Sequence, residues 1–118
     1  MGDQEAIDLD SAFIAAFNDM ADAVHKTACN KGWHDSPRSL AEEICLMHSE
    51  LSEALEGVRR PGPDRHCPEF SQIEVEFGDV IIRLMDSAKK HGLRVAEALV
   101  AKAAVNEGRA YRHGGALL

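Results

Sequence analysis

Hydrophobic residues recur three or four positions apart in four segments of the chain, which is the spacing of an amphipathic helix. The segments cover about residues 9–30, 37–58, 69–90 and 95–106. No segment alternates between apolar and polar residues as a half-buried strand does. The pattern therefore predicts an all-α fold.

Helix-capping and helix-breaking residues set the expected helix boundaries. Lys31-Gly32 ends the first segment, and Asp35-Ser36 followed by Pro37 is a typical start for the second. The loop that begins at Arg59-Arg60-Pro61-Gly62-Pro63-Asp64 separates the second and third segments. Gly108, Gly114 and Gly115 predict an irregular, basic tail over residues 107–118.

Each long helix carries an apolar stripe that is expected to face inward. The stripe residues are Phe13, Ala16, Phe17, Met20 and Val24; Leu40, Ile44, Met47, Leu51, Leu55 and Val58; and Phe70, Ile73, Phe77, Val80, Ile81 and Leu84. A chain of 118 residues suits one domain, residues 1–118. We therefore expect the subunit of a four-helix bundle that oligomerisation completes, as a homodimer or a homotetramer.

The charge of the chain is strongly asymmetric. Its formal net charge is -7, with 17 acidic and 6 basic residues in 1–82 but 3 acidic and 7 basic residues in 83–118. The net charge argues against a nucleic-acid partner. An acidic body with a basic end suits a metal complex of an anion, although scattered surface charge would give the same counts.

The remaining composition favours a cytoplasmic protein. Cys29, Cys45 and Cys67 form no CxxC pair and are expected to be reduced thiols. No signal peptide is visible at the N-terminus, and no run of about 18 apolar residues predicts a membrane span.

Two acidic couplets are the strongest chemical signal. Glu50 and Glu53 lie three residues apart in the second helical segment, and Glu76 and Asp79 do so in the third. Residues at this spacing share a helix face, and both couplets fall on the same shoulder of the apolar stripe. Solvated charges would collect on the far face instead. Four carboxylates near a core predict a bound cation.

The ligand type selects a hard cation. An all-carboxylate site without His or Cys suits Mg²⁺, with Mn²⁺ as a second possibility. A di-iron bundle would require Glu-x-x-His pairs on two helices, which the sequence lacks. A hard dication beside a basic segment is typical of phosphate chemistry.

These motifs resemble the MazG-like family of all-α nucleoside triphosphate pyrophosphatases. The family's ExxE and ExxD motifs read here as Glu50-x-x-Glu53 and Glu76-x-x-Asp79, separated by 22 residues. The similarity extends over about residues 30–118, including Lys31-Gly32-Trp33-His34 and Asn106-Glu-Gly-Arg109-Ala-Tyr111-Arg112-His113.

The resemblance implies Mg²⁺-dependent hydrolysis of a (d)NTP between the α- and β-phosphates, giving (d)NMP and pyrophosphate. Glu50, Glu53, Glu76 and Asp79 are then the metal ligands, and Glu50 or Glu53 is the catalytic base. Two alternatives stay open: a phosphohydrolase restricted to dUTP or a modified nucleotide, and a non-catalytic helical scaffold or regulator that keeps an acidic edge.

One position departs from the family pattern. Many members carry a further Glu directly before the first motif, where this chain has Ser49. Glu43, which lies close to Glu50 around the helix, is a candidate substitute acid. The number of metal ions depends on this point.

Several residues are candidates for substrate binding. Lys102, Asn106, Arg109, Arg112 and His113 are expected to contact phosphates, or else to be favourable basic charges at a helix end. Trp33, the single tryptophan, offers either a stacking surface for a base or a hydrophobic cap on the bundle. Arg83 shares the face of Glu76 and Asp79, and either pairs with Asp79 or Asp86 or supports the site.

Overall fold

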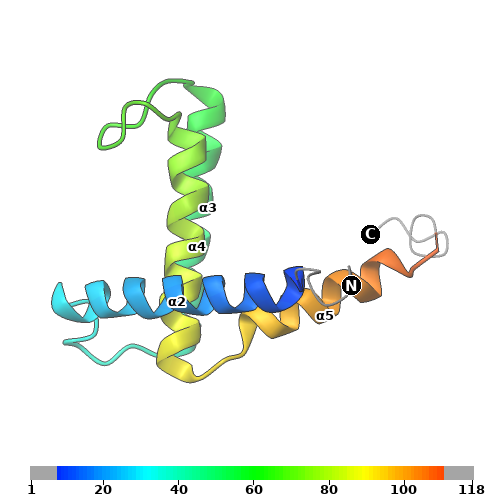
Figure 1. Cartoon of the computed structure of the whole chain (residues 1–118). Helices are drawn as coiled ribbons and strands as arrows, with labels where there is room; N and C mark the ends of the chain where they lie inside the picture. Colours follow the sequence, from blue (N-terminus) through cyan, green and yellow to red (C-terminus); the bar gives the residue numbers. More distant parts are fainter. Residues whose placement is uncertain (1–7, 111–118) are drawn as a thin grey trace. The chain divides into compact units, whose positions relative to one another are not determined.

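The computed structural model describes residues 8–110, which form four helices and no strand. The helices are α2 (Leu9–Asn30), α3 (Leu40–Arg59), α4 (Gln72–His91) and α5 (Val95–Glu107) (Figure 1). The predicted all-α class is confirmed. Within the described residues, no helix is long and apolar enough to cross a membrane.

The described chain divides into two compact units. The first contains the beginning of α2, up to Asp19, together with α5 from Arg94 onward. A cavity of about 260 Å³ in this unit is lined mainly by apolar side chains, among them Phe13, Leu99 and Val100. The second unit, Met20–Leu93, holds the end of α2, α3 and α4. The expectation of one domain stays a prediction.

Helices α3 and α4 form an antiparallel pair (Figure 1). Pairs of contacting residues run in opposite directions along the two helices, from Gly57 beside Ile73 to Glu43 beside Lys90. The loop over residues 60–71 connects the two helices. It folds back on itself so that Gln72 N–H, at the start of α4, donates to Gly62 O at 3.0 Å. All four acidic residues of the two couplets lie on these two helices.

Capping boxes place the starts of α3 and α4. Ser39 accepts the backbone N–H of Glu42 while the Glu42 side chain accepts the backbone N–H of Ser39, and Ser71 and Glu74 repeat the arrangement on α4. The predicted starts at 37 and 69 are therefore wrong by about three residues. The reason is local: Ser-x-x-Glu satisfies the free N–H groups of the first turn better than Ser-Pro does.

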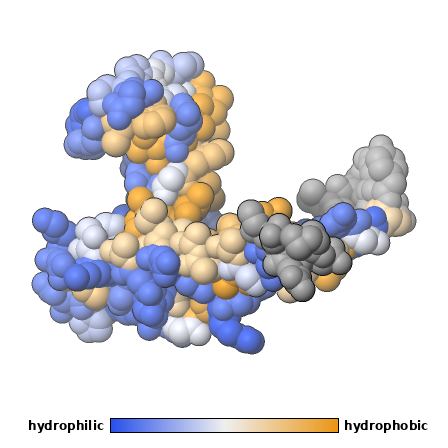
Figure 2. All heavy atoms as spheres, viewed as in Figure 1, coloured by the Kyte–Doolittle hydropathy of each residue, from blue (hydrophilic) through white to orange (hydrophobic). Residues whose placement is uncertain are grey.

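The predicted inward stripe is wrong for many of its residues within this chain. Exposed stripe residues include Ile44, Leu51, Leu55 and Val58 of α3, and Phe77 and Ile81 of α4 with Phe70 just before it. Figure 2 shows hydrophobic residues along the α3–α4 pair. The buried hydrophobic residues are instead small, five alanines and Met85. Within the second unit, many of the large apolar residues of α3 and α4 are therefore exposed.

Candidate functional site

Three of the four predicted metal ligands meet between α3 and α4. Glu50 extends from α3, and Glu76 and Asp79 extend from α4 one turn apart. One carboxylate oxygen from each of the three lies within 4.8 Å of the other two. The antiparallel pairing produces this convergence because it sets the middle of α3 opposite the first half of α4.

Glu53 lies at the rim of the same site. It is exposed and stands outside the tight group of three, but it lines the same pocket, whose volume is about 440 Å³. The pocket, called the acidic pocket below, is lined by Glu50, Glu53, Pro63, Asp64, Arg65, His66, Gln72, Glu76 and Asp79. A pocket of this size admits a metal ion together with phosphate groups.

The loop between α3 and α4 supplies residues that the sequence patterns did not identify. Asp64 is buried and accepts the backbone N–H groups of His66 and Cys67, both at 2.8 Å, and these bonds hold its pKa below the usual range. This turn carries Arg65 and His66 to the wall of the acidic pocket. Its only sequence signal is an Asp directly after Pro-Gly-Pro, a common turn pattern.

The acidic group carries more negative charge than Arg83, the cation that pairs with Glu50, can balance. Burial, together with the facing carboxylates of Glu50, Glu53 and Asp79, raises the pKa of Glu76 to about 7. Burial, and then the charge of Glu50, also raises the pKa of Asp79. Oε2 of Glu76 is buried and has no hydrogen-bond partner among the described residues. A buried carboxylate oxygen without a donor fits a metal ligand.

Arg83 links the acidic group to Trp33. Its Nε–H donates to Glu50 Oε1 at 2.7 Å, and its guanidinium carbon lies 5.1 Å from the centre of the Trp33 ring. This distance is within range for a cation–π contact. Of the predicted roles, support of the site fits; the predicted pairing with Asp79 or Asp86 is wrong.

Glu43 does not supply a further acid to this group. Its carboxylate is buried and accepts bonds from Ser87 Oγ at 2.9 Å, Lys90 Nζ at 2.6 Å and His91 Nε2 at 2.9 Å. Burial alone would raise its pKa, but these partners lower it to about 2. The expectation that Glu43 replaces the acid missing at Ser49 is therefore wrong, because three donors on α4 occupy its oxygens.

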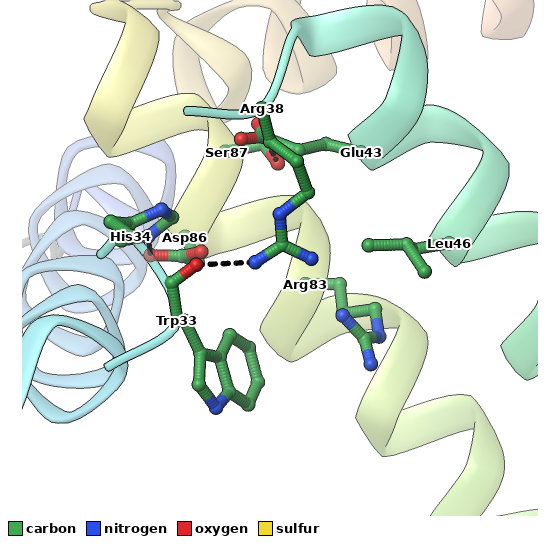
Figure 3. Close-up of a pocket in the computed structure, with 8 residues that line it drawn as sticks. All are labelled: Trp33, His34, Arg38, Glu43, Leu46, Arg83, Asp86 and Ser87. Carbon is green, nitrogen blue, oxygen red and sulfur yellow. Dashed lines mark hydrogen bonds and ion pairs between the residues drawn. The ribbon is translucent and has the colours of Figure 1, made fainter. Parts of the chain in front are cut away.

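Trp33 is held by the turn that follows α2. Gly32 adopts a φ of 84°, and the chain then folds back so that Trp33 N–H donates to Ala28 O at 3.0 Å. The Arg38 side chain donates to the carbonyl of Trp33 (Figure 3). The indole ring is thereby fixed beside Arg83.

An apolar cavity of about 450 Å³ adjoins the acidic pocket. It is lined by Met20, Ala23, Val24, Thr27, Ala28, Trp33, Asp79 and Ile82. Asp79 lines both spaces, so an apolar compartment and a carboxylate compartment share one wall. Trp33 thus lies at a cavity of the size of a ligand site, which supports its interpretation as a stacking surface.

The structure does not test the predicted phosphate contacts of the C-terminal part, because α5 and the acidic group belong to different units. Lys102 and Asn106 on α5, and Arg109 beyond it, belong to the first unit and are exposed. Arg112 and His113 lie outside the described residues. Their contact with substrate stays a prediction.

Comparisons with known proteins give no relative from which to transfer a function. The chain matches no protein-family model, no curated protein and no solved structure.

Proposed function

We propose that this chain is a Mg²⁺-dependent nucleoside triphosphate pyrophosphohydrolase that cleaves (d)NTPs between the α- and β-phosphates. The observation that carries the proposal is the convergence of Glu50, Glu76 and Asp79, together with a buried Glu76 oxygen that has no donor among residues 8–110. Three acids held this close repel one another unless a cation lies among them. The resemblance of the two motifs to the MazG-like family supplies the reaction.

The donor set fits Mg²⁺. Glu50, Glu76 and Asp79 would hold the ion, with Glu53 reaching it from the rim, and all four offer carboxylate oxygens, which hard cations prefer. Mn²⁺ would fit the same donors. When bound, the metal neutralises triphosphate charge and lowers the pKa of a coordinated water.

Glu53 is the better placed of the two candidate bases. Glu50 Oε1 is occupied by Arg83, whereas Glu53 is exposed and forms no ion pair within residues 8–110. In the proposed reaction, water adds to one phosphorus of the α–β anhydride while Glu53 takes its proton. The bond from that phosphorus to the bridging oxygen breaks, and pyrophosphate and the nucleoside monophosphate separate.

Substrate recognition would use both compartments. Arg65 and His66 line the acidic pocket, where Arg65 would supply positive charge and His66 a hydrogen-bond donor for phosphate oxygens. The base would enter the apolar cavity and stack on Trp33. Arg83 contacts both Trp33 and Glu50, and would therefore hold the stacking surface and the acidic group in fixed positions relative to each other.

We further propose that the chain acts as a homodimer or a homotetramer. The exposed residues Ile44, Leu51, Leu55 and Val58 follow one another at intervals of seven, four and three, which is heptad spacing. Phe77 and Ile81 on α4 are exposed and four residues apart, which fits the same spacing. A second copy with the same antiparallel pair would complete a four-helix bundle.

The function is tested by measuring pyrophosphate release from a panel of (d)NTPs with and without Mg²⁺. Glu53→Gln is expected to reduce kcat by roughly 10²–10⁴-fold, the usual contribution of a general base. Asp79→Asn and Glu76→Gln are expected to abolish turnover together with Mg²⁺ binding. Glu56→Gln is the matched control, since Glu56 lies one turn after Glu53 but pairs with Arg59 and Arg60.

Three outcomes distinguish the alternatives. Hydrolysis restricted to dUTP or one modified nucleotide would identify the specialised phosphohydrolase. A folded protein that releases no pyrophosphate from any nucleotide would favour the scaffold. Full turnover in Glu53→Gln or Asp79→Asn would contradict the residue assignment.

A further inference from the structure

A second group of potential metal ligands lies at the end of α2, and it differs in chemistry from the acidic group. His25 and Cys29 are four residues apart on one face of α2, and His34 follows in the turn after Trp33. One ligand atom from each of the three lies within 4.8 Å of the others. The turn at Gly32 causes the convergence because it returns the chain against the last turn of the helix.

Asp86 orients both imidazole rings. This carboxylate is buried on α4, and its Oδ1 lies 2.7 Å from His25 Nδ1 and 2.9 Å from His34 Nε2. Figure 3 shows His34 beside Asp86. Because an ionised carboxylate only accepts hydrogen bonds, the two nitrogens that face it carry protons. The opposite nitrogens, His25 Nε2 and His34 Nδ1, are then left with lone pairs when the rings are neutral.

Among residues 8–110, neither of these two nitrogens has a strong hydrogen-bond donor as its partner. His25 Nε2 lies 3.5 Å from Cys29 Sγ, and His34 Nδ1 is buried without a hydrogen-bond partner among the described residues. A buried polar atom without a partner is destabilising, because it has lost its hydrogen bonds to water. Histidines that donate one ring N–H to a carboxylate and leave the other nitrogen free are typical of metal sites.

We propose that His25, Cys29 and His34 bind Zn²⁺ or a similar borderline transition metal, at a site separate from the carboxylates of the acidic pocket. Two imidazoles and a thiolate suit zinc and are poor ligands for Mg²⁺. Ligand atoms of a tetrahedral zinc site lie about 3.3–3.8 Å apart. His25 Nε2 and Cys29 Sγ, which are 3.5 Å apart, already lie at this distance. Cys29 is exposed and has room to move.

The site would take three protein ligands and leave the fourth position to water. Bound metal would join the end of α2 to the turn that carries Trp33, and through Asp86 it would join both to α4. The expected consequence is a metal-dependent gain in stability of the second unit.

The test is a titration of the full-length, untagged and reduced chain with Co²⁺. The absorption spectrum of bound Co²⁺ shows whether a thiolate is among its ligands. One Co²⁺ per chain is expected to give a thiolate-to-cobalt charge-transfer band, and Zn²⁺ should displace it. A large excess of Mg²⁺ should leave the band unchanged. Cys29→Ser is expected to remove the band, whereas Cys45→Ser and Cys67→Ser, which change the other two exposed thiols, should retain it.

Further variants separate ligands from neighbours. Asp86→Asn is expected to weaken Zn²⁺ binding by roughly 10–100-fold, as loss of a carboxylate behind a ligating histidine does. His34→Gln should weaken it further, while His66→Gln should not. Zn²⁺ is expected to raise the melting temperature of the wild type but not of Cys29→Ser.

Two results would overturn the proposal. One is a wild-type chain that shows no charge-transfer band, which would mean that Cys29 only forms a weak S–H bond to His25. The other is a band that persists in Cys29→Ser and disappears with Cys45→Ser or Cys67→Ser.

Discussion

At the scale of single residues, Glu76 carries the largest electrostatic strain of the acidic pocket. It is only 7% exposed, it faces other carboxylates, and its Oε2 has no donor within residues 8–110. A proton or a metal ion would relieve this strain, and the two compete for the same oxygens. The proton belongs to the cluster as a whole, since the carboxylates interact strongly.

This competition predicts a pH dependence of stability in the metal-free protein. The pKa of Glu76 is about 7 in the folded chain against 4.5 as the ordinary value, so the folded state holds a proton that the unfolded state has lost. The contribution of Glu76 to stability is therefore complete below pH 4.5 and is lost as the pH rises through 7. Between pH 5 and pH 8 we expect a loss on the order of 1–3 kcal/mol.

Urea unfolding at several pH values measures this effect. Mg²⁺ at pH 8 should restore the lost stability, and Glu76→Gln should flatten the curve between pH 5 and pH 8. Glu56→Gln is the control that should leave the curve unchanged. A metal-free protein whose stability rises over this interval would contradict the environment described for Glu76.

Sequence patterns identified the carboxylates but only part of their surroundings. Like charges three residues apart on the shoulder of an apolar stripe are unusual enough to indicate a site, and Glu50, Glu76 and Asp79 do converge. The partner of Arg83 was not predictable, because a helix places its side chain near several acids and packing selects one. Asp64 was missed because loop residues carry no periodicity.

At the scale of elements, the helices were predictable to within a few residues because periodicity and capping are local properties. The close approach of α3 and α4 is not local. Gly57 is buried, and a Cβ built on it would lie 3.1 Å from Ile73 Cγ1. Gly78 on α4 faces open space, with nothing within 4 Å of such an atom. Both glycines lie inside predicted helices, so the sequence does not distinguish them. Only the packing of α3 against α4 shows that Gly57 has a close neighbour and Gly78 has none within 4 Å.

Substitution at these glycines is expected to have opposite effects. Gly57→Leu should destabilise the chain by about 1–3 kcal/mol, because the added side chain must separate the helices. Gly78→Ala should stabilise it by up to about 1 kcal/mol through helix propensity. Chemical denaturation of both variants measures the difference; a stable Gly57→Leu protein would contradict the close packing at Ile73.

At the scale of the whole molecule, periodicity shows which helix face is apolar but not which chain covers it. The stripe of α3 and α4 was predicted to be internal, yet much of it is exposed, and the buried hydrophobic residues are mainly alanines. A small core stabilises a chain of this length poorly. An exposed apolar stripe of this extent supports the proposed assembly.

Oligomerisation is tested by light scattering coupled to gel filtration. The wild type is expected at the mass of a dimer or a tetramer. Leu51→Glu should shift the mass toward the monomer, because a charge would be buried at the centre of the stripe. Ser52→Glu is the matched control, since it adds the same charge at the next, exposed position. A monomeric wild type would contradict the proposed assembly.

Because Asp79 lines both compartments, it limits which substitutions the proposed enzyme can accept. Asp79 borders both the carboxylate compartment and the apolar one. In the proposed enzyme, changing it to admit a different base would therefore also change a proposed metal ligand. Ala23, Val24 and Thr27 of α2 border the apolar compartment alone. If the proposed function is correct, divergence toward new nucleotides is expected to proceed by substitution on α2, while α3 and α4 retain the proposed metal site.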